Sequence, residues 1–150
     1  MQTSNRQVAE QDVLFYVLNS DDPHTLDQFV AKLCQKILSE QRQCDIRLAD
    51  EMTMERLNRT LWAFKPESFL PHSIQNQCPA PIQLWTEKIA QPKKDVLLNL
   101  HPDFPVLHPQ YQRTIEVLDQ SAALIERGRH RWRQYKQAGF EPIVHKIGQK

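Results

Sequence analysis

Glycine is scarce in this sequence of 150 residues, and all three glycines (Gly128, Gly139 and Gly148) lie near its end. The Walker loop and the G-x-G-x-x-G turn both need closely spaced glycines where a strand passes into a helix. No such loop can be written anywhere before position 128. The sequence therefore argues strongly against enzymes that bind nucleotides through these loops.

Cysteine is also rare, and long apolar runs are missing. Cys34, Cys44 and Cys78 give an odd count without a C-x-x-C pair, which favours neither a disulfide framework nor a zinc knuckle. No stretch reaches the roughly 18 apolar residues that a membrane helix needs, and the polar residues 1–11 do not resemble a secretory signal. We therefore expect a protein of the reducing cytoplasm.

The average composition is that of a globular protein, with 40% hydrophobic and 25% charged residues. We expect a polar extension at 1–11 and a single α/β domain at 12–150. The net charge of +1 conceals an asymmetry: residues 1–55 carry ten acidic and five basic side chains, whereas residues 126–150 carry two and seven. This local basicity favours a defined anionic partner over general coating of nucleic acid.

Apolar strand-like segments alternate with helical patterns along the chain. Parallel neighbours need crossover connections, so this alternation predicts a three-layer α/β/α fold with a mostly parallel, Rossmann-like sheet of about five strands and no phosphate-binding glycine loop. Pro23 and Asp50 fit the start of the first and second helices. The expected strands are 12–18, 44–49, 82–85, 95–100 and 114–118, the helices are 23–41, one after Asp50 and 120–138, and residues 142–147 are a candidate edge strand.

The segment 127–136 holds five basic residues and two large aromatic residues, with no acidic residue among them. Helical spacing places Arg129, Trp132, Arg133 and Lys136 on one face, which we expect to be exposed. An indole beside guanidinium groups can hold an anion that is attached to an apolar group. The alternative is a solvated helix face whose cations only complement the helix dipole.

The opposite face of this helix is predicted to pack on the core. It carries Leu124, Gly128, Tyr135 and Ala138, and Gly128 would allow the helix to approach the layer beneath it closely. We expect Arg131 to reach outward from the edge of this face.

A second candidate surface is the segment 64–72 with Trp62 just before it. Pro66 and Pro71 stiffen the segment, which we expect to present Phe69 and Leu70 to a partner. The alternative is that Trp62 and Phe69 cap the core beneath a long loop.

Catalytic and metal-binding motifs are poorly represented. His72, His101 and His108 lie in segments read as proline-rich loops, without H-E-x-x-H or a ligand pair at i, i+4, and isolated loop histidines are usually solvated. Cys78 has no neighbouring acid that would orient a base. We expect no enzyme, no cofactor and no metal site, although an active site assembled only by the fold would escape this reasoning.

Four segments together resemble the chi subunit of bacterial DNA polymerase III, over about residues 13–140. They are L-x-x-x-L-W-x-x-x-P-E-S-F-L-P-H at 57–72, P-A-P-I at 79–82, D-V-L-L-N-L at 95–100 and R-x-R-W-R-x-Y-K-x-A-G-F at 129–140. The resemblance implies a small α/β protein without catalysis. It also implies two partners, the psi subunit of the clamp-loader complex and the acidic C-terminal tail of single-stranded DNA-binding protein.

The resemblance gives each candidate residue a role. Trp62 and Phe69, with Leu70 beside them, would bind psi. For the tail, we expect Arg129 to pair with the terminal carboxylate, Trp132 and Ile125 to receive the apolar side chain, and Arg127, Arg133 and Lys136 to face the upstream acidic residues. Some family members carry a basic residue where this chain has Ile125. The rival hypothesis is direct binding of single-stranded nucleic acid, with the arginines on phosphates and Trp132 stacked on a base.

Overall fold

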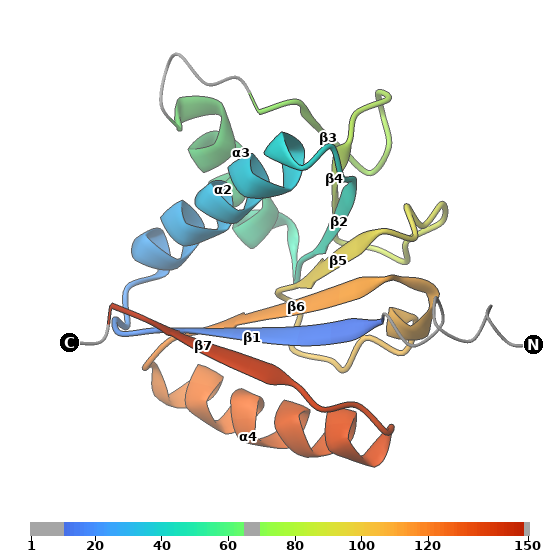
Figure 1. Ribbon diagram of the computed structural model, residues 1–150. Helices are drawn as coiled ribbons and strands as arrows, with labels where there is room; N and C mark the ends of the chain where they lie inside the picture. The colour runs from blue at the N-terminus through green and yellow to red at the C-terminus, as the bar shows by residue number, and fades with distance from the viewer. Residues whose placement is uncertain (1–10, 65–69, 149–150) are drawn as a thin grey trace, which may run out of the picture.

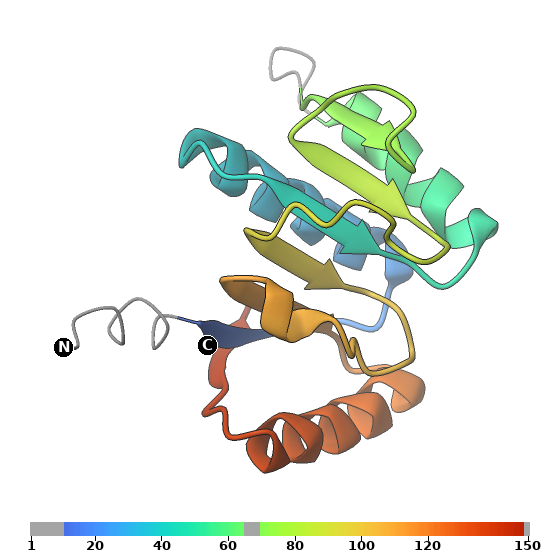
Figure 2. The same ribbon diagram turned by 90° about the vertical axis from the view of Figure 1, so that its right-hand side faces the viewer.

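The computed structural model describes residues 11–64 and 70–148, in which seven strands form one sheet (Figure 1). The order across the sheet is β3-β4-β2-β5-β6-β1-β7, and every neighbouring pair is parallel. Figure 2 shows the strands following one another from β3 and β4 down to β6 and β1. The bounds are β1 (Asp12–Leu18), β2 (Cys44–Arg47), β3 (His72–Ile74), β4 (Ile82–Trp85), β5 (Val96–Asn99), β6 (Arg113–Leu118) and β7 (Ile143–Ile147).

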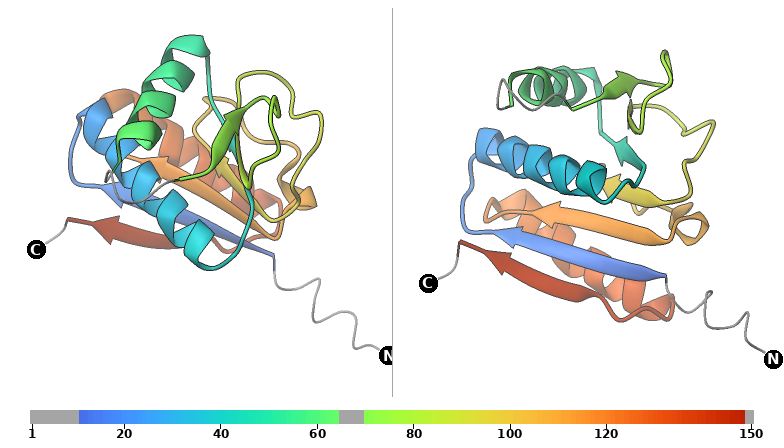
Figure 3. Two further views of the ribbon diagram at one scale, coloured as in Figure 1. Left: turned by 90° about the horizontal axis from the view of Figure 1, so that it is seen from above. Right: turned by 45° about the horizontal axis from the view of Figure 1, so that its top comes forward.

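Helices cover both faces of the sheet, which confirms the predicted α/β class. Helices α2 (Pro23–Ser39) and α3 (Glu51–Ala63) lie on one face, and α4 (Ala122–Gln137) lies on the other, beneath β6, β1 and β7 (Figures 1 and 3). A short 3-10 helix, η1 (His108–Gln110), lies in the connection from β5 to β6. None of the described helices has the length and apolar character needed to cross a membrane.

The helix starts follow from local hydrogen bonding. The Asp22 carboxylate accepts bonds from the backbone N–H groups of His24 and Thr25, both at 3.3 Å, just before α2. Asp50 and Thr53 form a reciprocal capping box at α3, in which Thr53 N–H donates to Asp50 Oδ1 at 2.9 Å. These caps satisfy N–H groups that have no partner within the helix.

The sheet has two more strands than the roughly five predicted. The candidate edge strand at 142–147 forms β7, and β3 was not anticipated. Because β3 has only three residues and follows Pro71, no alternation of side chains reveals it in the sequence.

The two faces of the sheet differ in polarity. Toward α2 and α3, the register aligns the apolar side chains of Leu14, Ile115, Leu98 and Ile46. Toward α4, one row instead runs Phe15, Glu116, Asn99, Arg47 and Trp85 across β1, β6, β5, β2 and β4. Buried polar groups on this second face need partners, and α4 supplies those of Glu116 through Arg131 and Tyr135.

Candidate functional site

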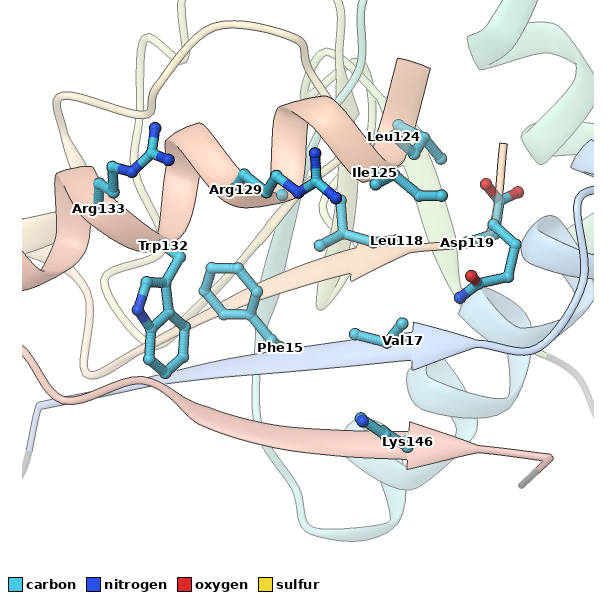
Figure 4. A pocket seen from close by; sticks show the side chains of 12 residues that line it. Phe15, Val17, Leu118, Asp119, Leu124, Ile125, Arg129, Trp132, Arg133 and Lys146 are labelled. Carbon is cyan, nitrogen blue, oxygen red and sulfur yellow. The ribbon is translucent and has the colours of Figure 1, made fainter. Parts of the chain in front are cut away.

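A cavity of about 710 Å³ lies between α4 and the sheet, over β6, β1 and β7 (Figure 4). The close-up shows Arg129 and Arg133 extending from the helix, Trp132 and Phe15 side by side below them, and Lys146 on the opposite wall. Its lining residues are Phe15, Val17, Leu118, Asp119, Gln120, Leu124, Ile125, Gly128, Arg129, Trp132, Arg133 and Lys146.

The arginines of the cavity are available to an outside anion. Arg129 has a side chain that is 67% exposed, and among the described residues it forms an ion pair with Glu126, with 3.9 Å between Nη1 and Oε1. Such exposed ion pairs contribute little to folding stability, on the order of 0 to 1 kcal/mol. Arg133 is exposed and has no ionic partner among the described residues.

The floor of the cavity is apolar. Trp132 is half-buried rather than fully exposed, because its ring meets that of Phe15 edge-on, with 5.8 Å between centroids and 79° between planes. Leu118 is buried beneath it, and Ile125 is 37% exposed at the rim. The cavity therefore combines an apolar base with cations above it, the arrangement expected from the spacing at 129, 132 and 133.

Two of the predicted site residues do not line this cavity. Lys136 lies beside it: its Nζ is 5.9 Å from the Trp132 ring centroid, and it donates to both carboxylate oxygens of Glu141 at 2.8 and 2.6 Å. Arg127 is half-buried on the other side of α4, where it lines a different cavity together with Asp103. The structure thus brings together Ile125, Arg129, Trp132 and Arg133.

The expectation that Arg131 reaches outward is wrong. Arg131 is buried, and its Nη1 donates to Glu116 at 3.1 and 3.0 Å. Tyr135 donates its hydroxyl proton to the same carboxylate at 2.7 Å. Burial raises the pKa of Glu116, and Arg131 and Tyr135 oppose that rise. Two features of the sequence point to this pair. Arg131 shares a helical face with Gly128 and Tyr135, and Glu116 is an acid within the apolar strand T-I-E-V-L.

The close approach predicted for Gly128 is confirmed. A Cβ added at this position would lie 2.9 Å from Cδ1 of Leu118. The missing side chain therefore lets α4 sit directly on β6 and lets Leu118 form part of the cavity.

Lys146 and Asp119 are cavity residues that sequence reasoning missed. Lys146 aligns with Val17 of β1, and Val17 aligns with Leu118, so all three side chains face α4. Asp119 is buried, and its Oδ1 accepts bonds from the backbone N–H and hydroxyl of Ser121 at 3.0 and 2.7 Å. Lys146 reaches the cavity because the strand order places β7 beside β1.

The second predicted surface is only partly visible. Trp62 is 60% exposed, and its ring centroid lies 4.9 Å from that of His72. Leu70 is 3% exposed and belongs to the core, so the expectation that it faces a partner is wrong. Its apolar side chain belongs to the buried cluster that also contains Leu57 of α3 and Leu84 of β4, and burial removes it from water. Phe69 lies outside the described residues.

The family model for "DNA polymerase III chi subunit, HolC" matches residues 11–142. The chain belongs to this family. It is 29% identical over 134 residues to DNA polymerase III subunit chi of Pseudomonas aeruginosa, covering 89% of this chain and 94% of that protein. It is 25% identical over 138 residues to the chi subunit of Escherichia coli, covering 87% and 94%. This membership makes the chain an accessory subunit of DNA polymerase III in DNA replication.

In the described part of this chi-family chain, titratable side chains do not converge on a metal site. Among residues 11–64 and 70–148, no three His, Cys, Asp or Glu side chains are placed to hold a metal ion. The expectation of solvated loop histidines fails for His108, which is 4% exposed and packs against the rings of Phe104, Tyr135 and Phe140. Burial lowers its pKa.

Proposed function

We propose that this chi-family subunit is a non-catalytic adaptor. It bridges the clamp-loader complex, through the psi subunit, to the acidic C-terminal tail of single-stranded DNA-binding protein. The observation that carries the proposal is the cavity under α4, which offers exposed guanidinium groups directly above an apolar floor. A peptide that ends in an apolar residue with a free carboxylate, preceded by acidic residues, presents the complementary groups.

Each part of such a tail has a receiver in the cavity. Arg129 takes the terminal carboxylate as a two-pronged pair, because its guanidinium is exposed and only weakly engaged by Glu126. The apolar side chain enters between Trp132 and Ile125, above Phe15. A hydrogen bond between charged groups contributes about 1.5 to 3 kcal/mol, so Arg129 dominates the polar part of the binding.

The outer cations act at longer range. Arg133 faces the cavity and attracts the upstream acidic residues of the tail. Lys136 attracts them less strongly, because its ammonium already pairs with Glu141. Arg127 lies across α4 from the cavity and contributes only to the general positive field. Exposed pairs of this kind add about 0 to 1 kcal/mol each and weaken with salt, so these residues mainly set the association rate.

Calorimetry with a synthetic acidic tail peptide tests the first surface. We expect Arg129→Ala to lower the affinity by more than about tenfold, in line with the loss of a charged hydrogen bond. Arg59→Ala is the matched control, because Arg59 is an exposed arginine of α3 in the opposite layer. Unchanged affinity in Arg129→Ala, with normal urea unfolding, would refute the assignment.

The psi surface is proposed to centre on Trp62 and Phe69. Trp62 exposes a large indole on α3. An indole that becomes buried when a partner binds is a common anchor of protein interfaces. Leu70 supports this surface from the core and does not contact the partner. Trp62→Ala and Phe69→Ala should each abolish co-purification of psi while tail binding persists. Met52→Ala, at another exposed apolar position of α3, should change neither activity.

Direct binding of single-stranded nucleic acid is the rival function. Trp132 is half-buried against Phe15, and Lys136 lies over its ring, which leaves little of the indole for stacking on a base. A phosphate binder would hold naked single-stranded DNA with a steep salt dependence. The adaptor should instead prefer DNA coated by the binding protein, and should lose it when the acidic tail of that protein is deleted.

A further inference from the structure

We propose that Lys146 of β7 is a specificity-determining residue of the cavity and binds an acidic side chain of the docked peptide from the side opposite α4. The inference rests on the proposed function, since it concerns the same acidic peptide. It adds a second charged wall on the sheet, so that the peptide lies in a channel between α4 and β7 instead of on the helix alone.

The sheet register fixes the direction of the Lys146 side chain. Lys146 aligns with Val17 of β1, which aligns with Leu118 of β6, and all three residues line the cavity. Alternate residues of a strand point to opposite faces, so His145 points to the other face, where its ring stacks on Tyr16 with 5.1 Å between centroids. Figure 4 shows Lys146 across the cavity from Arg129.

The ammonium of Lys146 is not neutralised by any carboxylate within residues 11–64 and 70–148. Across the part of the chain that the structure describes, it forms no ion pair. Asp119 is the acid that lines the same cavity, but it is buried and already accepts two hydrogen bonds from Ser121. An exposed cation in this position is free to bind an anion from outside.

The distribution of charge around the cavity favours an anion with more than one carboxylate. Three cations line it: Arg129 and Arg133 on α4, and Lys146 on β7. Like charges facing the same hollow repel one another, and a polyanionic ligand between them relieves that repulsion. A terminal carboxylate on Arg129 leaves Lys146 for a different group. The nearest available group of an acidic peptide is a side-chain carboxylate that precedes its last residue.

Two peptides separate these groups. One carries the acidic side chains with a free C-terminus, and the other has the same sequence with those side chains replaced by their amides. We expect Lys146→Gln to weaken the first peptide about three- to fivefold at low salt, as for an exposed ion pair, and to leave the second unchanged. Lys146→Arg should restore affinity for the first, because the charge remains. Lys32→Gln, at an exposed lysine of α2, is the matched control.

The outcomes distinguish this inference from the function on which it rests. If Arg129→Ala weakens the acidic peptide and Lys146→Gln does not, the proposed function stands and the role of Lys146 is overturned. An equal effect of Lys146→Gln on both peptides would also overturn it, because the lysine would then sense the terminal carboxylate. If the wild-type protein binds neither peptide, both proposals fail together.

Discussion

Nη1 of Arg131 donates to both carboxylate oxygens of Glu116 at 3.1 and 3.0 Å, and the two side chains are 3% and 1% exposed. Arg129 and Arg133, two positions away on either side, face solvent. A half-turn of helix therefore separates a buried ion pair from exposed cations. Arg131 of the basic segment is therefore part of the core, whereas Arg129 and Arg133 line the cavity, although all three carry the same charge.

Removal of Arg131 should destabilise the fold. Arg131→Ala leaves the Glu116 carboxylate buried without its cation, which costs about 3 to 5 kcal/mol in the free energy of unfolding. Arg129→Ala should stay within about 0.5 kcal/mol of wild type, as surface substitutions usually do. Urea unfolding followed by circular dichroism measures both variants. Equal stabilities would contradict the structural role of Arg131.

The stability of the protein should depend on pH through His108. Burial lowers the pKa of this ring in the folded state, whereas a histidine in the unfolded chain has a pKa of about 6.5. As pH falls below about 6.5, the unfolded chain takes up a proton that the folded protein does not, so the free energy of unfolding decreases. The stabilisation is fully present above that pH and is lost progressively below it.

His108→Phe tests the pH dependence, because it keeps an aromatic ring among Phe104, Tyr135 and Phe140. Thermal unfolding between about pH 5 and 7.5 should show a shallower pH dependence than wild type. The same substitution at exposed His24 serves as the control. A slope unaltered by His108→Phe would count against the burial argument.

A methyl group at position 128 should affect the cavity more than the fold. Gly128→Ala gains about 1 kcal/mol in helix propensity, but its Cβ would lie 2.9 Å from Cδ1 of Leu118. Leu118 must shift, and it lines the cavity. We expect stability within about 1 kcal/mol of wild type and weaker tail binding in calorimetry. Gln134→Ala, on an exposed face of the same helix, should leave tail binding intact.

Trp132 should contribute to both the fold and the cavity. Because the ring is half-buried against Phe15, Trp132→Ala should cost about 1 to 3 kcal/mol of stability and more than about tenfold in tail affinity. Trp132→Phe keeps the contact with Phe15, so it should retain most of the stability and an intermediate affinity. Parallel unfolding and calorimetry separate the two effects. Normal tail binding by a folded Trp132→Ala protein would exclude the indole from the site.

The sequence alone was sufficient for the fold class, because apolar strands that alternate with amphipathic helices can bury both kinds of element only in a layered, mostly parallel arrangement. It also indicated that positions 129, 132 and 133 share one side of α4, through helical spacing, but the exposure expected of Trp132 is wrong, because its ring is half-buried against Phe15. Short or isolated features were harder to see. The three-residue β3 has too few side chains to show a period, and the apolar character of Leu70 did not reveal whether it would face a partner or the core.

Local pattern thus determined which elements form and which side of α4 carries the cations. The tertiary structure alone decided that Glu116 lies opposite Arg131 and that Lys146 lies beside Val17. The first follows from the packing of α4 on β6, and the second from strand order and register, which place residues more than 100 positions apart side by side. Short-range periodicity contains no information about such pairings, because long-range burial and parallel hydrogen bonding establish them only when the whole sheet forms.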